Sequence, residues 1–168
     1  MRHSRKALWR RCAQIVSTVD IPRPFSVPAL VAALAARRGR PIELIPLAAR
    51  PDTPCGVLAA TDRADYVFYA ADTSPLHQEH ILLHELGHLL CGHAGSGELH
   101  ETVARVLMPN LPVELVRRVL GRTGYAQQQE QEAELVASMV MHQARREQGP
   151  APVSGGLARL RSAFGPGA

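Results

Sequence analysis

The chain has 168 residues, 46% of them hydrophobic, so it is long enough to bury a core of its own and suits one domain. Only 4% of the residues are aromatic, so the core must consist largely of Leu, Val, Ile and Ala, and we expect an α+β fold, mainly helical, with a small sheet. The formal net charge of +4 comes almost entirely from arginine near the two ends of the chain, where a solvated basic surface is a simpler interpretation than direct contact with nucleic acid.

The cysteines and the first residues indicate the compartment. Cys12, Cys55 and Cys91 are scattered without C-x-x-C spacing, which argues against a disulfide framework and against a thiolate zinc site. Basic residues are frequent in the first eleven positions, but the segment 12–20 that follows is too short and too polar for the apolar region of a signal peptide. The sequence also has no apolar run long enough to span a membrane. We therefore expect a cytoplasmic protein.

The first helix is predicted over residues 4–19. Its apolar side chains lie on one side and its basic side chains mostly on the other, which is the pattern of an amphipathic helix that packs on the domain. The segment 20–24 contains two prolines and ends the helix, so we treat residues 1–24 as a basic N-terminal helix and linker.

A second helix and a strand should follow. Ser26 is a suitable N-cap, and Pro28 suits the first turn of a helix over 28–38 that Gly39 would close. Residues 41–46 are bounded by prolines and predict a short strand, as found at the edge of a sheet.

Two further strands are predicted before the middle of the chain. Residues 48–54 hold two prolines and predict a loop, and the apolar runs 55–60 and 66–71 on either side of 61–65 predict a β-hairpin. The strand before the next helix could form the rim of a cleft, where an extended peptide adds to its free edge by backbone hydrogen bonds. An interior position for that strand is an equally good interpretation.

The rest of the chain is predicted to be mainly helical. Residues 72–75 should cap a helix that ends near Gly92. Beyond it we expect a flexible turn, a short helix, a long helix and a flexible tail, at residues 94–97, 113–120, 126–148 and 149–168 in that order.

Five residues inside the helix after residue 75 form the pattern H-E-x-x-H, namely His84, Glu85, Leu86, Gly87 and His88. Histidines four positions apart lie on one face of a helix, so both imidazoles can reach a single Zn²⁺ at about 2.0 to 2.1 Å. Glu85 is rotated by roughly 100° from His84, where its carboxylate can take a proton from an attacking water. The pattern predicts a hydrolytic zinc centre.

The rest of this helix supports a metal site. His77, His80 and Cys91 fall on the same face as His84 and His88, while four leucines cluster on the opposite face. An ordinary core helix would not gather histidines on one side, because each would need a hydrogen-bond partner or a metal.

A catalytic zinc site needs a third protein ligand, which must lie outside the motif. In the extended histidine pattern the third histidine comes ten residues after the first, and that position is Ala94 here, so His93 is not expected to serve. The long helix offers Glu130, Glu132 and Glu134. Only Glu132 points into the packed face of that helix, where a buried carboxylate needs a partner such as a metal. We therefore expect Glu132 as the ligand, with Glu130 and Glu134 mainly facing solvent.

These residues resemble the ImmA/IrrE-like family of zinc metallopeptidases. The likeness rests on the segment 80–93, His-Ile-Leu-Leu-His-Glu-Leu-Gly-His-Leu-Leu-Cys-Gly-His, and on residues 132–137, Glu-Ala-Glu-Leu-Val-Ala, which look like the family's Glu-Ala-Asn-x-Phe-Ala block. The resemblance implies a zinc metallopeptidase-like domain over 25–148, with His84, His88 and Glu132 as ligands and Glu85 as general base. It also implies a partner, because such proteins are associated with cleaving or otherwise inactivating helix-turn-helix repressors.

The expected function is metal-assisted hydrolysis of a protein or peptide, with Glu85 as the proton acceptor. A further side chain should stabilise the oxyanion, and His77, His80, His100 and Tyr125 are the candidates. A rival interpretation is a regulatory binding module, in which zinc only stabilises the fold and the protein sequesters a repressor or antitoxin. A nucleic-acid binder that uses the arginine-rich ends is a second rival.

Overall fold

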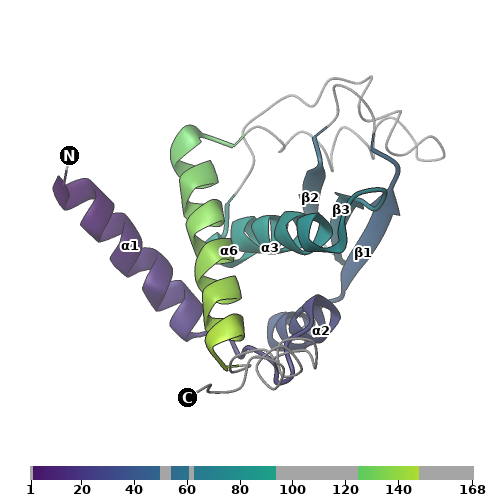
Figure 1. Cartoon of the computed structure of the whole chain (residues 1–168), viewed down its shortest axis with the longest axis horizontal. Coiled ribbons are helices and arrows are strands. Elements are labelled where there is room, and N and C mark those ends of the chain that lie inside the picture. Colours follow the sequence, from purple (N-terminus) through teal and green to yellow (C-terminus); the bar gives the residue numbers. More distant parts are fainter. Residues whose placement is uncertain (1, 50–53, 61–62, 94–124, 148–168) are drawn as a thin grey trace, which may run out of the picture.

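The computed structural model describes residues 2–49, 54–60, 63–93 and 125–147. These residues form four helices and a three-stranded mixed sheet, which confirms the predicted α+β class. The helices are α1 (Arg2–Ser17), α2 (Val27–Arg38), α3 (Pro75–Cys91) and α6 (Gln127–Glu147), and the strands are β1 (Ile42–Leu47), β2 (Gly56–Ala60) and β3 (Asp65–Ala70). Figure 1 shows α3 at the centre of the molecule, with the sheet on one side and α6 on the other.

The helix ends follow the capping residues of the sequence. The side-chain oxygens of Ser26 and Ser74 each accept a hydrogen bond of 3.3 Å from a backbone N–H in the first turn of α2 and α3. Gly39 and Gly92 end the same two helices in the left-handed conformation, with φ values of 68° and 67°. The predicted bounds of all four helices are confirmed to within about two residues.

The sheet has the strand order β1-β3-β2. The central strand β3 pairs in parallel with β1 and antiparallel with β2, so the predicted hairpin and the predicted edge strand are both confirmed. The strand that directly precedes α3 is therefore an interior strand. The free edge next to α3 in the described sheet belongs to β2, which contacts α3 along with β3.

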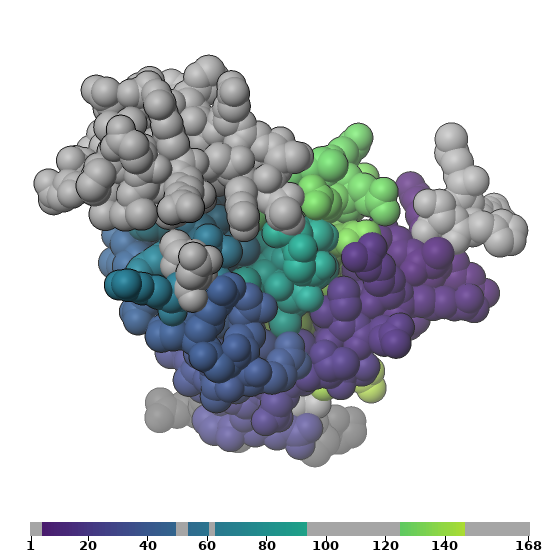
Figure 2. Space-filling model, turned by 180° about the vertical axis from the view of Figure 1, so that it is seen from behind, coloured from purple at the N-terminus to yellow at the C-terminus, as the bar shows by residue number. Residues whose placement is uncertain are grey.

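The core lies where α3 meets α6 and the sheet. Leu83, Leu86, Val136 and Val67 are among its most deeply buried side chains. Helix α1 packs against α6 through the predicted apolar face, which includes the fully buried Cys12. The surfaces of α1 (purple) and α6 (green) adjoin in Figure 2. None of the helices in the described ranges is both long and apolar enough to cross a membrane.

One buried carboxylate joins α2 to the sheet. Asp65, at the start of β3, is fully buried and accepts hydrogen bonds from Arg38 at 3.0 Å and from Arg40 at 2.6 Å. Two half-buried arginines therefore balance one buried negative charge. The predicted turn at 94–97, the short helix at 113–120 and the tail at 149–168 lie outside the described residues.

Candidate metal centre

The two motif histidines lie one turn apart on α3 and face each other. Their Nε2 atoms are 3.1 Å apart, and their ring centroids are 4.8 Å apart. Two nitrogens bound tetrahedrally to one zinc ion at 2.0 to 2.1 Å would lie about 3.3 Å apart. His84 and His88 are therefore spaced for a shared cation.

The protonation state of His88 also suits a metal ligand. Its burial, together with the nearby imidazoles of His84 and His93, lowers its pKa to about 3. The ring is neutral at neutral pH, and a neutral imidazole has the lone pair that binds a metal. Tyr125 stacks on this ring, with centroids 3.6 Å apart and planes inclined by 13°, and so restricts its orientation.

A carboxylate from α6 completes the cluster. Oε2 of Glu130 lies 3.2 Å from Nε2 of His84, and Oε1 of Glu130 lies 3.7 Å from Nε2 of His88. Ligand atoms of these three residues lie within 4.8 Å of one another, so the group could hold a metal ion. Three protein donors are the set found in catalytic zinc sites, whereas structural sites use four.

Glu132, the predicted third ligand, lies elsewhere. It is buried, as expected, but its Oε2 lies 3.0 Å from Nε2 of His93 and its Oε1 lies 3.1 Å from the guanidinium of Arg11. The packed face of α6 points toward α1 and the end of α3, so a cation and an imidazole already partner this carboxylate. Among the described residues, the carboxylate that lies close to both His84 and His88 is that of Glu130, while the role of Glu132 as a ligand stays a prediction.

Glu85 lies in the same cleft as the cluster and is buried. Burial in the first place, and then the negative charge of Glu130, raises the pKa of Glu85 to about 8, while a hydrogen bond from the backbone N–H of Leu58 opposes the shift. A cation held nearby would favour the carboxylate and lower this pKa again. Strand β2 approaches so closely that a Cβ at Gly56 would lie 2.5 Å from Oε1 of Glu85. The glycine therefore leaves room for the carboxylate.

Three of the four candidates for oxyanion stabilisation line this cleft, namely His77, His80 and Tyr125, while His100 lies outside the described residues. Burial, followed by the negative charges of Glu85 and a second glutamate, raises the pKa of Tyr125, so its hydroxyl stays protonated. His80 is less available, because its Nε2 lies 3.3 Å from a carboxylate oxygen of α6. The hydroxyl of Tyr125 therefore keeps a proton that it can donate in a hydrogen bond.

A second group of possible ligands consists of Cys91, His93 and Glu132. Its surroundings disfavour a cation, because the positive charge of Arg11 already contacts Glu132. Burial, together with Cys12 and Glu132, raises the pKa of Cys91 to about 11, so in the absence of a cation the thiol is protonated. His93 was not expected to bind the metal, yet only 4% of its side chain is exposed.

Comparison with known proteins gives no family for this chain. No protein-family model matches it, and no curated protein matches it either. Its function must therefore be inferred from the side chains of the site.

The cluster opens on a cleft of about 370 Å³ between β2 and α3. Residues 54–58 line one wall, and the histidine face of α3 lines the other, with Tyr125, Glu130 and Glu134 completing the lining. The edge of β2 that pairs with no strand among the described residues thus borders the candidate metal centre. An extended peptide could pair with such an edge through its backbone.

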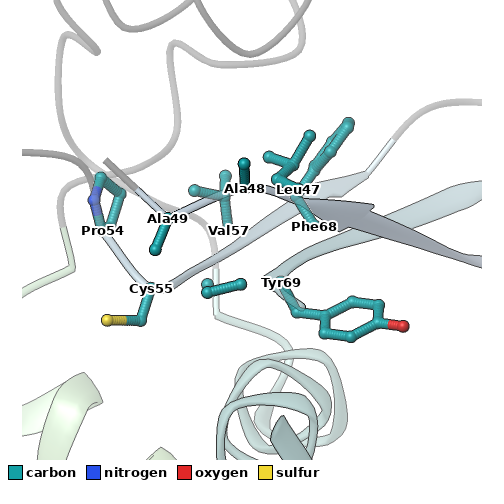
Figure 3. Close-up of a pocket in the computed structure, with 10 residues that line it drawn as sticks. Leu47, Ala48, Ala49, Pro54, Cys55, Val57, Phe68 and Tyr69 are labelled. Atoms are coloured by element: carbon teal, nitrogen blue, oxygen red, sulfur yellow. The ribbon is translucent and has the colours of Figure 1, made fainter. Parts of the chain in front are cut away.

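A second pocket at the end of the sheet is much smaller. Figure 3 shows Leu47 and Phe68 on one face of the strands, with Cys55 and Tyr69 directed to the other face. Its volume of about 10 Å³ has room for roughly one water molecule. The cleft beside β2 is therefore the better candidate for a substrate.

Proposed function

We propose that this chain is a zinc-dependent, metallopeptidase-like hydrolase that cleaves or otherwise inactivates a protein partner. The observation that supports this most strongly is the convergence of His84, His88 and Glu130 within reach of one ion, beside the buried carboxylate of Glu85. This combination of two imidazoles, one carboxylate and a neighbouring proton acceptor suits hydrolysis.

Zinc is the proposed ion because two imidazoles and one carboxylate are a ligand set that zinc hydrolases use. Bound there, zinc would supply Lewis-acid activation of a carbonyl group and of a water. His84, His88 and Glu130 would hold the ion. Glu132 would contact His93, which in turn contacts His88.

The chain's own residues supply the remaining chemistry. Glu85 would accept the proton of the attacking water and pass it to the leaving amine, since its carboxylate lies in the cleft and is kept out of bulk water. The hydroxyl of Tyr125 would donate a hydrogen bond to the developing oxyanion. The free edge of β2 would align an extended polypeptide beside these groups.

The proposed substrate is a protein or peptide, and the resemblance in residues 80–93 and 132–137 favours a helix-turn-helix repressor or a similar regulatory protein. The three cysteines carry free thiols, as the expected reducing cytoplasm would maintain them. Direct contact with nucleic acid is not part of the proposal.

Metal content tests the first half of the proposal. The purified full chain should hold one equivalent of zinc, and His84→Ala, His88→Ala and Glu130→Ala should each lose it. Glu43→Gln changes an exposed glutamate on β1 and serves as the matched control, which should keep its zinc. A chain that holds no zinc at any tested concentration would contradict the proposal.

Cleavage tests the second half. The zinc-loaded protein is incubated with a proteome-derived peptide library, and mass spectrometry records new peptide ends. Wild type should generate them, while Glu85→Gln should keep zinc but generate none, because it lacks the proton acceptor. If a co-expressed repressor is captured intact and neither protein yields new ends, the non-proteolytic binding module is the better description.

A further inference from the structure

The two ring nitrogens of His88 face different groups. Nε2 points into the candidate metal centre, 3.1 Å from Nε2 of His84. Nδ1 points the other way and lies 3.0 Å from Nδ1 of His93. The side chain of His88 thus joins the metal centre to a second, buried polar group.

This second polar group extends through α6 to α1, near the N-terminus of the chain. Nε2 of His93 lies 3.0 Å from Oε2 of Glu132, and Oε1 of Glu132 accepts a hydrogen bond of 3.1 Å from Arg11 on α1. Only 1% of the His88 side chain and 4% of the His93 and Glu132 side chains are exposed. Water therefore competes little for the contacts among His88, His93 and Glu132, whereas the Arg11 side chain that ends the chain of contacts is 57% exposed.

The positions of the protons follow from metal binding. An imidazole that binds a metal through Nε2 gives up the lone pair on that atom and carries its proton on Nδ1. His88 must then donate from Nδ1 to Nδ1 of His93, so the proton of a neutral His93 lies on Nε2. Nε2 donates in turn to Glu132, whose ionised carboxylate can only accept. One arrangement of protons satisfies every contact, and it is the arrangement that leaves Nε2 of His88 free for the ion.

We propose that His93, Glu132 and Arg11 form a hydrogen-bond chain that holds His88 in its metal-binding tautomer and orientation. This inference rests on the proposed metal centre and makes the three residues positioning residues. Carboxylates and backbone carbonyls commonly support metal-binding histidines in this way. Here a second histidine is interposed, and the carboxylate is paired with a cation.

The local fold explains how His93 reaches His88. Helix α3 ends at Cys91, and Gly92 adopts a left-handed conformation that no side chain would favour. The chain turns back at this point, and the backbone N–H of His93 bonds to the carbonyl oxygen of His88 at 3.0 Å. The turn therefore brings the ring of His93 against the ring of His88, with centroids 5.2 Å apart and planes inclined by 65°.

The other histidine of the pair, His84, has a hydrogen-bond partner that is much more exposed to water. Nδ1 of His84 lies 3.4 Å from Oε2 of Glu134, whose side chain is 50% exposed. Water can replace an exposed carboxylate at little cost, whereas a buried partner leaves an unsatisfied group when it is lost. Loss of His93 should therefore weaken metal binding more than loss of the Glu134 carboxylate.

Zinc affinity of the full chain, measured by competition with a chelator, tests the inference. His93→Phe fills the space but cannot accept a hydrogen bond from Nδ1 of His88, and it should weaken zinc binding roughly 10- to 100-fold. His93→Gln offers a side-chain oxygen to Nδ1 of His88 and should restore much of the affinity. Glu132→Gln should weaken it about tenfold, since the charge is lost but an acceptor remains. His142→Gln and Glu43→Gln alter exposed residues of the same types and should match wild type.

Nitrogen-15 NMR of zinc-loaded wild type provides a readout that needs no variant. The inference requires the proton of His88 on Nδ1 and that of His93 on Nε2. A His88 that binds zinc through Nδ1, or a His93 protonated on Nδ1, would overturn it even if every variant failed to fold. Circular dichroism of the metal-free variants separates weakened binding from lost structure.

Three outcomes of these measurements would show whether the hydrogen-bond chain or the metal centre is wrong, or whether His93 belongs to a separate zinc site. If His93→Phe is folded and binds zinc as wild type does while His84→Ala does not, the hydrogen-bond chain is wrong and the metal centre stands. If His84→Ala and wild type bind zinc equally weakly, the metal centre itself is wrong. If wild type binds two zinc ions and His93→Phe loses one without affecting the other, then Cys91, His93 and Glu132 form a separate site, and the inference is overturned.

Discussion

Gly87 on α3 lies against the backbone of Ala133 on α6, so closely that a Cβ on the glycine would come within 2.6 Å of the Ala133 carbonyl oxygen. Both residues are buried, and this is where the two helices cross. Glu130 lies about one turn before Ala133 on the same helix. The middle glycine of the motif therefore allows α6 to bring its carboxylate to the two histidines.

Gly87→Ala tests this contact. Alanine favours a helix over glycine by about 1 kcal/mol, but overpacking against a backbone costs about 1 to 3 kcal/mol. We expect a net loss of up to about 2 kcal/mol in the free energy of unfolding of the metal-free protein, measured with urea, and weaker zinc binding because α6 must shift. Adding Ala133→Gly should not rescue the variant, since the atoms in contact belong to the backbone. A more stable protein with unchanged zinc affinity would contradict the close crossing.

Asp65→Ala should destabilise the fold without touching the metal centre. The change leaves Arg38 and Arg40 facing each other beside the start of β3. Loss of one partner of a fully buried ion pair costs about 3 to 5 kcal/mol, but these arginine side chains are 31% and 29% exposed and can turn to water. We therefore expect a loss of about 2 to 3 kcal/mol in chemical denaturation. Asp20→Ala, at an exposed position, should cost less than about 0.5 kcal/mol, and equal costs for the two variants would refute the role of Asp65.

Local sequence patterns predicted most of the fold because the helix ends are encoded locally. Ser26 and Ser74 satisfy backbone groups within their own first turns, and Gly39 and Gly92 supply the left-handed conformations that end the same helices. The strands were predictable from short apolar runs between prolines and polar turns. The order of the strands was not, because β3 pairs in parallel with β1 only after the chain has passed through the segment between β1 and β2 and through β2 itself.

The partners of Glu130 and Glu132 could not be predicted from the sequence. The helical pattern identifies which carboxylate faces the core, and Glu132 does face it. What decides its partner is Arg11, which comes from a helix 121 positions earlier in the chain. His93 was overlooked for a related reason. It follows the helix end, where exposure is the usual outcome, and the turn at Gly92 folds it back against His88.

The three cysteines should react with iodoacetamide at very different rates. Cys55 is exposed, whereas burial and neighbouring groups raise the pKa of Cys91 to about 11 and also raise that of Cys12. Because the thiolate is the reactive form, Cys91 should react at least about tenfold more slowly than Cys55 at pH 8 in metal-free protein. Its rate should rise by about tenfold for each pH unit up to pH 10, since more thiolate forms as pH approaches the pKa. Peptide mapping by mass spectrometry gives the three rates, and a Cys91 that matches Cys55 at pH 8 would show that it is not held in this environment.

Tyr125→Phe separates the two roles proposed for this residue. The phenyl ring keeps the stacking on His88, so zinc affinity should stay within about threefold of wild type. The variant lacks the hydroxyl that would donate to the oxyanion, and removal of one such donor typically lowers kcat by about 100- to 1,000-fold. The release of new peptide ends by zinc-loaded protein measures this loss, with KM expected to change little. Tyr125→Ala removes the ring as well and should weaken zinc binding in addition. Full activity of Tyr125→Phe would exclude the hydroxyl from the reaction and leave His77 and His80 as the described candidates in the cleft.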